Sequence, residues 1–325
     1  RSKKLAFESP NIWMNMRIRT QICLVSFAFL IFGCSYFEKA SVDNTISIER
    51  DALNPEPSFL RGKYLVEGPA GCAGCHTPTT SPTGQEWDKR IVPVKGMHLG
   101  GKKMIDNVMM TVYAHNLTPG SRISNWSNEA LELSIREGIR PDGSLIGFPM
   151  PFHGYRKLSD SDAESMVLYL RNIPAVKNEL PDSSYGVMNL LIPSSYGPKL
   201  SYIKSPSNDD LIERGKYIAE ISNCGTCHAP TKMFFNSNGP GPDISKLYHG
   251  GHELKGSWGK AVAPNITSHT KALGKYSDKE LMKIITKGIK PNGFKLSPGM
   301  NYAAYDKLNE KDLIALVAYL RTIPA

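Results

Sequence analysis

Apolar side chains recur at intervals of three and four residues in two pairs of segments, a spacing that predicts amphipathic helices. In the first pair, Ser127 and Ser277 precede the apolar positions as helix N-caps do, and Glu280 completes a capping box in the second member. The second pair begins at Ser159 and Asn309, and each member stops at an Ile-Pro pair, because proline ends a helix. No long alternating pattern typical of strands occurs. The predicted fold class is therefore mostly α.

The chain is internally doubled. Residues 138–175 and 288–325 align without gaps and share 16 identities in 38 positions. Shorter matches upstream keep the same order: Arg-Gly-Lys-Tyr at 61–64 and 214–217, Gly-Gly at 100–101 and 250–251, and Asn-Leu/Ile-Thr at 116–118 and 265–267. We therefore expect two tandem domains, at residues 57–176 and 208–325. The segment between them, 177–207, is rich in Pro, Ser and Tyr and is predicted to be an extended linker that packs along a domain surface.

The N-terminal region has the pattern of an export signal. Arg17 and Arg19 precede an apolar run of about a dozen residues, which is too short to span a bilayer. We expect a leader at residues 14–33. Because the run ends in Gly33-Cys34, it resembles the lipobox of bacterial lipoproteins, with Cys34 as the acylated first residue of the mature chain and 34–56 as a tether. A cleaved soluble signal and an uncleaved anchor are the alternatives. The expected location is the periplasmic side of a bacterial membrane, with a lipid anchor at Cys34.

Composition and charge exclude several classes of protein. The 325 residues are 41% hydrophobic and 21% charged, which is ordinary for a globular chain and too apolar for a disordered one. Six cysteines are too few for a disulfide scaffold of this length. The formal net charge is +9, but much of the excess positive charge lies within residues 1–33. We therefore expect no nucleic acid partner.

The candidate chemistry lies in two Cys-x-x-Cys-His motifs, Cys72 to His76 and Cys224 to His228. This spacing is typical of covalent attachment of haem c, because two thiols on one helical turn can reach adjacent vinyl groups while the next residue ligates the iron. The cofactor-binding residues would be Cys72, Cys75 and His76 in the first domain, and Cys224, Cys227 and His228 in the second. The alternative is a zinc site with four thiolate ligands, or a thiol redox pair. Two covalently attached haem c groups are favoured for three reasons. The cysteine pairs lie in separate repeated domains, each pair is followed by histidine, and the chain has the pattern of an export signal.

A second axial ligand for each iron is predicted from the repeat. Of twelve methionines, only Met150 and Met300 occupy matching positions, each 12 residues after the leading glycine of a Gly-Ile-Arg/Lys-Pro motif. We expect His76 and Met150 to ligate the first iron, and His228 and Met300 the second. Methionines that merely fill the core are the alternative, and His153 is a second candidate in the first domain.

Taken together, these motifs resemble class I cytochrome c domains over nearly all of residues 57–325. More narrowly, Arg-Gly-Lys-Tyr, Cys-x-x-Cys-His-x-Pro, Asn-Leu/Ile-Thr, Arg/Lys-Pro-Asp/Asn-Gly and Tyr-x-Lys-Leu resemble the multihaem cytochrome c subunits of membrane-bound alcohol, aldehyde and gluconate dehydrogenases. The resemblance implies that Asn116, Asn265, Trp126 and Tyr276 approach the haem propionates. A capping Asn and a packed aromatic are alternative roles for these side chains.

The expected function is electron transfer, with no catalytic residues. Histidine and methionine ligation leaves no open position on the iron, and no Ser-His-Asp arrangement or glycine-rich phosphate loop is visible. The chain would carry electrons as a subunit or partner of a periplasmic dehydrogenase, which donates to it, and would pass them to an oxidase or a quinone-linked acceptor. The alternatives are a dihaem peroxidase-like enzyme with one displaceable axial ligand, and a haem-based sensor or structural module.

Overall fold

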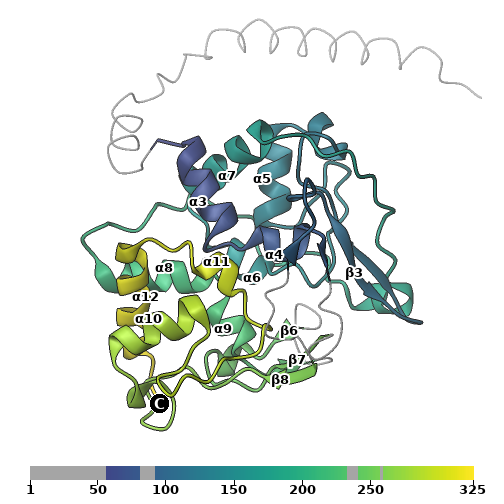
Figure 1. Cartoon of the computed structure of the whole chain (residues 1–325). Coiled ribbons are helices and arrows are strands. Elements are labelled where there is room, and N and C mark those ends of the chain that lie inside the picture. Colours follow the sequence, from purple (N-terminus) through teal and green to yellow (C-terminus); the bar gives the residue numbers. More distant parts are fainter. Residues whose placement is uncertain (1–55, 81–91, 233–240, 257–258) are drawn as a thin grey trace, which may run out of the picture. The chain divides into compact units, whose positions relative to one another are not determined.

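The computed structural model describes residues 56–80, 92–232, 241–256 and 259–325 (Figure 1). The predicted leader, Cys34 and almost all of the predicted tether lie outside these residues. We refer to described residues 57–176 as the first half and 208–325 as the second half. Within the described residues, no helix is both long enough and apolar enough to cross a membrane.

Helices dominate the described residues, as the sequence predicted. The α-helices are α3 (Phe59–Glu67), α4 (Cys72–His76), α5 (Asn128–Arg136), α6 (Phe152–Tyr155), α7 (Asp160–Asn172), α8 (Leu211–Ile221), α9 (Cys224–Cys227), α10 (Asp278–Lys287), α11 (Tyr302–Tyr305) and α12 (Glu310–Thr322). Short 3₁₀ turns occur at η1 (Arg122–Asn125), η2 (Gly186–Leu191), η3 (Ile244–Lys246) and η4 (Leu273–Lys275).

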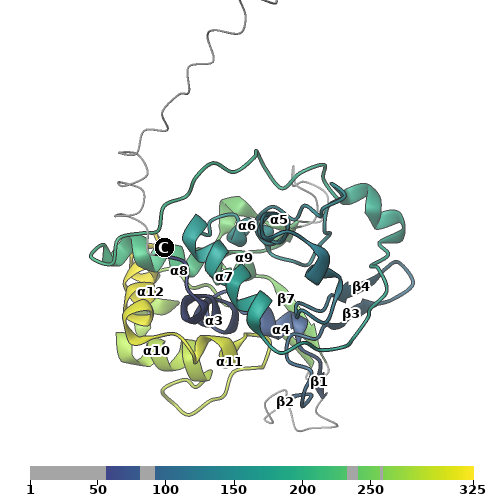
Figure 2. The same ribbon diagram turned by 90° about the horizontal axis from the view of Figure 1, so that it is seen from above.

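Small antiparallel strand pairs accompany the helices, and the hydrophobic pattern did not predict them. They pair β1 (Thr79–Thr80) with β2 (Val92–Pro93), β3 (Lys102–Asp106) with β4 (Thr111–Ala114), β5 (Thr231–Lys232) with β6 (Gly241–Pro242), and β7 (Glu253–Gly256) with β8 (Gly259–Val262). Figure 2 shows β3 and β4 side by side beyond the helices. Such strands are too short to give a period-two signal, and the β3–β4 register shifts between Lys103 and Ile105.

The predicted helix ends are confirmed. Ser127 and Ser277 cap α5 and α10, and the second cap is a complete capping box with Glu280. Ser159 and Asn309 cap α7 and α12 through their side chains, which accept hydrogen bonds from backbone N–H groups. These local signals are strong because the capping side chain satisfies an N–H group that has no partner within the helix.

In each half, the first and last long helices pack against each other, α3 on α7 and α8 on α12. Both contacts have a glycine at the closest approach. A Cβ atom on Gly62 would lie 1.8 Å from the carbonyl oxygen of Ser165, and one on Gly215 would lie 1.9 Å from that of Ala315. These helix backbones therefore touch, and no larger residue fits between them.

Residues 183–203 lie against the first half. Ser184 pairs with Thr111 through two backbone hydrogen bonds of 2.8 Å, which extend the β3–β4 region. Tyr185 and Met188 are buried and form a small apolar cluster with Val112. The side chains of Tyr185 and Met188 thus pack against the first half.

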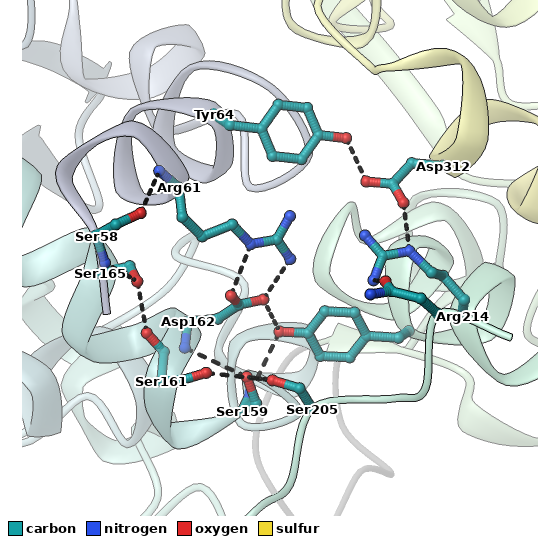
Figure 3. A network of polar contacts seen from close by, with 12 residues as sticks. Ser58, Arg61, Tyr64, Ser159, Ser161, Asp162, Ser165, Ser205, Arg214 and Asp312 are labelled. Atoms are coloured by element: carbon teal, nitrogen blue, oxygen red, sulfur yellow. Dashed lines mark hydrogen bonds and ion pairs between the residues drawn. The ribbon is translucent and has the colours of Figure 1, made fainter. Parts of the chain in front are cut away.

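The two halves are joined by a reciprocal network around two buried carboxylates (Figure 3). Asp162 of α7 accepts two hydrogen bonds of 2.7 Å from Arg61 of its own half and one of 2.6 Å from the Tyr217 hydroxyl of the other half. Asp312 of α12 likewise accepts hydrogen bonds from an arginine of its own half and a tyrosine of the other. Asp162 is 1% exposed and Asp312 is 0% exposed, so both carboxylates depend on protein donors.

Asp312 receives hydrogen bonds of 2.6 Å from Arg214 of its own half and 2.6 Å from the Tyr64 hydroxyl of the first half. The arginine and the tyrosine of each Arg-Gly-Lys-Tyr motif therefore bind different aspartates. The arginine binds the aspartate of its own half, and the tyrosine three residues later binds the aspartate of the other half. Burial and the neighbouring aspartate raise the pKa of Tyr64 and of Tyr217 far above the ordinary value, so both hydroxyls remain donors.

A third link between the halves involves Glu67 at the end of α3. Its carboxylate accepts hydrogen bonds from Lys307 of the second half at 2.7 Å, from the Tyr169 hydroxyl at 3.0 Å, and from the His98 ring. Burial acts to raise the pKa of Glu67, but the bonds from His98 and Lys307 outweigh it and lower that pKa to about 2. One apolar core cluster also includes residues of both halves, among them Leu65 and Ile218.

We predict that Gly62→Ala and Gly215→Ala each destabilise the protein by about 1–3 kcal/mol, because the added methyl group has to push two helix backbones apart. Without that contact, the same change inside a helix would stabilise it by about 0.5–1 kcal/mol. Equilibrium urea unfolding measures the difference. Lys63→Ala, on the exposed side of α3, is the control and is expected to change the stability by less than about 0.5 kcal/mol. A stabilising effect of Gly62→Ala would contradict the packing described.

Glu67→Gln is predicted to lower the free energy of unfolding at neutral pH by on the order of 2–3 kcal/mol. Because the folded-state pKa of Glu67 is about 2 and its ordinary value is 4.5, this contribution is present above pH 4.5 and is lost as the pH falls towards 2. The stability difference between wild type and variant should therefore shrink over that window in urea titrations at a series of pH values. Asp106→Asn, at an exposed pair with Lys103, serves as the control. A difference that does not depend on pH would contradict the assignment.

Candidate functional site

The two Cys-x-x-Cys motifs form short helices. Cys72 and Cys75 lie in α4, and Cys224 and Cys227 lie in α9. The residue before each helix is left-handed, at Gly71 with φ 62° and at Asn223 with φ 57°, which turns the chain sharply out of the preceding helix. The four thiols are unpaired, and burial raises the pKa of Cys72 and of Cys224 to about 12. Two thiols thus lie on one helical turn at each site.

The histidine of each motif is oriented by a backbone carbonyl group. Nδ1–H of His76 donates to the carbonyl oxygen of His115 at 2.6 Å, and Nδ1–H of His228 donates to that of Pro264 at 2.7 Å. Because a carbonyl oxygen only accepts, Nε2 is the nitrogen left with a lone pair. Burial lowers the pKa of His76 to about 4 and also lowers that of His228, so both rings are neutral at pH 7. A neutral imidazole with a free Nε2 is the form that ligates a metal ion.

In the second half, the predicted residues line one cavity of about 620 Å³. Cys224, Cys227 and His228 contribute to its wall, and Met300 lines it as well. Most of the remaining wall is apolar, with Leu254, Ile266, Leu281, Ile284, Ile285, Leu316 and Leu320 among its residues. A large apolar cavity with a few converging polar groups is typical of a cofactor site.

Met150 and His153 differ in burial. Met150 is half-buried and packs against the core that Cys72 also contacts, in the loop before α6. His153 is exposed, in α6 itself. Met150 thus lies at the part of the core that the first cysteine motif also contacts.

The side chains of Asn116 and Asn265, which occupy matching places in the repeat, hold their own turns. The Asn116 side-chain oxygen accepts bonds of 2.8 Å from the backbone and hydroxyl of Thr118, and its amide nitrogen donates to Val176 at 2.6 Å. Asn265 binds Thr267 in the same way, at 2.8 and 2.7 Å, and also lines the cavity of the second half. At both positions the side chain thus closes a turn with the threonine two residues later.

Trp126 and Tyr276 occupy equivalent places after η1 and η4. Both are half-buried against the core, and Tyr276 lines the cavity of the second half. Their backbone carbonyl groups accept hydrogen bonds from Arg171 and Arg321, respectively. Sequence reasoning assigned no role to these arginines, although both stand in matching Tyr-Leu-Arg segments of the repeat.

Sequence reasoning assigned Tyr155 and Tyr305 no role beyond their place in the Tyr-x-Lys-Leu motif. The Tyr155 hydroxyl donates to the carbonyl oxygen of Ala70 at 2.6 Å, and the Tyr305 hydroxyl donates to that of Ser222 at 2.9 Å. Each bond ties α6 or α11 to the loop before the cysteine helix of the same half. The tyrosines therefore connect the segment after the predicted methionine with the segment that carries the thiols.

Residues 212–324 match the family model for cytochrome c. The chain is 29% identical over 286 residues to the fructose dehydrogenase cytochrome subunit of Gluconobacter japonicus, and this alignment covers 83% of the chain and 53% of that protein. It is 25% identical over 287 residues to the cytochrome c subunit of the alcohol dehydrogenase (quinone) of Gluconobacter oxydans, covering 83% and 55%. Over 114 residues it is 32% identical to the gluconate 2-dehydrogenase cytochrome c subunit of Pantoea cypripedii, covering 35% and 23%.

Residues 212–324 are a cytochrome c domain. The chain spans about half the length of the first two of these relatives. A cytochrome c domain binds haem c covalently, and the residues of this one fit that group. Two thiols, a neutral imidazole and a methionine border one apolar cavity, and such a set of donors suits haem c.

The attachment helices of the two halves lie close to each other. A Cβ atom on Gly74, within α4, would lie 2.7 Å from the side-chain nitrogen of Asn301, which directly follows Met300. Reciprocally, a Cβ atom on Gly154 would lie 2.4 Å from the side-chain oxygen of Asn223, which caps α9. In addition to burial, the Cys75 thiol raises the pKa of Cys227. The segment after each methionine thus packs on the cysteine helix of the other half.

Proposed function

We propose that the chain is a dihaem cytochrome c that carries electrons as a subunit or partner of a dehydrogenase. It would consist of two tandem domains, 57–176 and 208–325, joined by the linker 177–207. The matching helices, caps, glycine contacts and histidine–carbonyl bonds of the two halves support this division. The single observation that carries the proposal is the cavity of the second half, which Cys224, Cys227, His228 and Met300 line together.

In the first domain, Cys72 and Cys75 would hold the group through thioether bonds, and His76 and Met150 would ligate its iron. In the second, Cys224 and Cys227 would attach the group, and His228 and Met300 would ligate its iron. Haem c in these positions supplies reversible one-electron oxidation and reduction of iron. The carbonyl groups of His115 and Pro264 fix the imidazole rings, and the apolar wall of the second-half cavity would exclude water from the group bound there. These residues move no proton, so the chain transfers electrons and performs no catalytic chemistry of its own.

The reciprocal packing of the attachment helices supports electron transfer between the two sites. Asn301, which lines the cavity of the second half, contacts Gly74 of α4, and Asn223 before α9 contacts Gly154 of the first half. The Tyr64 and Tyr217 bonds to buried aspartates hold this arrangement in place. An electron accepted at one site would therefore have a short, fixed path to the other.

The zinc alternative has no support in the described part of the chain, where no cluster of three or more His, Cys, Asp or Glu side chains could hold a metal ion. The named relatives are cytochrome subunits of fructose, alcohol and gluconate dehydrogenases. By analogy with them, we propose a dehydrogenase as electron donor and an oxidase or quinone-linked complex as acceptor. The location would be periplasmic, with lipid anchoring at Cys34.

Mass spectrometry tests the cofactor content after expression in a bacterial host that attaches haem c. The wild-type chain should carry the added mass of two haem groups, with one on the peptide containing Cys72 and Cys75 and one on that containing Cys224 and Cys227. Chemical reduction should then give the absorbance change of two irons per chain. Paired Cys→Ser changes at 72 and 75, or at 224 and 227, should each remove one haem.

The matched control is Cys23→Ser, in the predicted leader, which should leave the haem content at two. A wild-type chain with a single haem, or with zinc in place of haem, would contradict the proposal.

A further inference from the structure

Part of the segment between the halves covers one loop of the first half. The Tyr196 ring stacks on Phe152 with ring centroids 4.5 Å apart, and its hydroxyl donates to the carbonyl oxygen of Ile146 at 2.7 Å. The Tyr185 hydroxyl donates to the carbonyl oxygen of Phe148 at 2.9 Å. Two tyrosines therefore shield the loop that follows the Arg-Pro-Asp-Gly motif.

The equivalent loop of the second half is open. Phe294, which follows the matching Lys-Pro-Asn-Gly motif, is 55% exposed, and Val262 of β8 is 54% exposed. Both side chains also line the cavity of the second half. No described tyrosine donates a hydrogen bond to the carbonyl groups of Leu296 or Pro298, the counterparts of the two that are covered in the first half. The mouth of this cavity thus presents exposed apolar side chains.

Lysines surround these apolar side chains. Lys271, Lys275 and Lys290 line the same cavity, and no described aspartate or glutamate does. Nζ of Lys290 lies 5.0 Å from the ring centroid of Phe294, over its face. Lys271 and Lys275 are exposed. The neighbouring hollow that Lys275 and Lys290 share includes Glu280, but its carboxylate is already bound within the capping box of α10. The mouth of the cavity therefore has an excess of positive charge.

This positive charge is specific to the second half. Residues 271–295 contain seven lysines against two acidic residues, whereas residues 121–145 of the first half contain three arginines against four acidic residues. Arg140, the counterpart of Lys290, donates to the carbonyl oxygen of Leu145 at 2.6 Å within its own turn. The two propionate carboxylates of a haem would still leave residues 271–295 positive. An acidic surface is therefore attracted to this part of the second half and not to its counterpart in the first.

We propose that the mouth of the second-half cavity is the docking surface for a redox partner protein with an acidic face. Carboxylates of the partner would pair with Lys271 and Lys275, and its apolar atoms would cover Phe294 and Val262. An apolar centre with a charged rim is the usual arrangement of a protein interface. One electron crosses this contact between the partner's redox centre and the iron bound at His228, and no bond forms or breaks. This inference rests on the proposed function, since it requires a haem in the second half.

An anionic lipid surface would match the charge of this face but not its apolar side chains. A helix that binds a membrane surface turns a broad apolar face outwards. The apolar residues of α10 face the other way, since Leu281, Ile284 and Ile285 line the cavity. The observations therefore favour a protein partner.

Stopped-flow reduction of the dihaem protein by reduced flavodoxin, a small acidic electron-donor protein, tests the surface. The second-order rate constant should fall at least about tenfold between about 0.01 M and about 1 M salt, because the screening length falls from about 30 Å to about 3 Å. Lys271→Glu combined with Lys275→Glu should lower the low-salt rate constant about tenfold and remove most of its salt dependence. At about 1 M salt, wild type and variant should react at similar rates.

The matched control is Lys63→Glu combined with Lys199→Glu, which makes the same change in net charge at exposed positions that do not line the cavity. It should leave the low-salt rate constant close to the wild-type value. The two reduction potentials and the haem content are measured on every sample. A change in potential alters the rate at every salt concentration, whereas a loss of electrostatic attraction alters it only at low salt.

If the wild type carries two haems and the double variant reacts like it at low salt, the docking inference is wrong while the dihaem function stands. The inference is also wrong if the control loses as much rate, or if the loss persists at about 1 M salt. Wild-type binding to phosphatidylglycerol vesicles, or a wild-type dimer, that the Lys271 and Lys275 changes abolish without slowing flavodoxin would overturn it in favour of a lipid surface or a second copy. If the wild-type peptide with Cys224 and Cys227 carries no haem, the proposed function itself fails.

Discussion

Two buried carboxylates hold the described structure together. Asp162 and Asp312 are almost completely shielded from water, and each is stabilised by an arginine of its own half and a tyrosine of the other. A buried charge that loses a donor is costly, so neither half can move away without leaving a carboxylate undersatisfied. This constraint fixes the contact between the halves. The packing of each cysteine helix against the segment after the other methionine follows from it.

The helices could be predicted from the sequence because their signals are local. A capping serine, a capping box and a terminal Ile-Pro pair act within one turn, and Ser127, Ser277 and Ser159 all cap helices in the structure. The partner of Tyr64 could not be predicted in the same way. Both halves contain the same Arg-Gly-Lys-Tyr motif and the same aspartate, so the sequence allows the tyrosine to bind within its half or across to the other. Only the fold selects the second arrangement.

The sequence predicted those residues of the candidate site that occur in both repeats. Met300 was found because Met150 stands at the same place, and the structure brings Met300 to one cavity with the second cysteine motif. The carbonyl groups that orient the two histidines could not be predicted in this way, because they belong to His115 and Pro264, which share no side-chain type. The available signal was their place directly before the repeated Asn-Leu/Ile-Thr motif.

The proposed electron transfer depends on each iron binding both an imidazole and a thioether. The ferric absorption spectrum distinguishes this ligation from others, because sulfur-to-iron ligation gives a weak far-red band. We expect this band in the amount typical of two haems, a loss of about half of it in Met150→Leu and in Met300→Leu, and no loss in Met109→Leu, which changes an exposed methionine. A high-spin ferric haem in the wild-type protein, or a band that survives both substitutions, would contradict this ligation and favour a haem enzyme with an open coordination position.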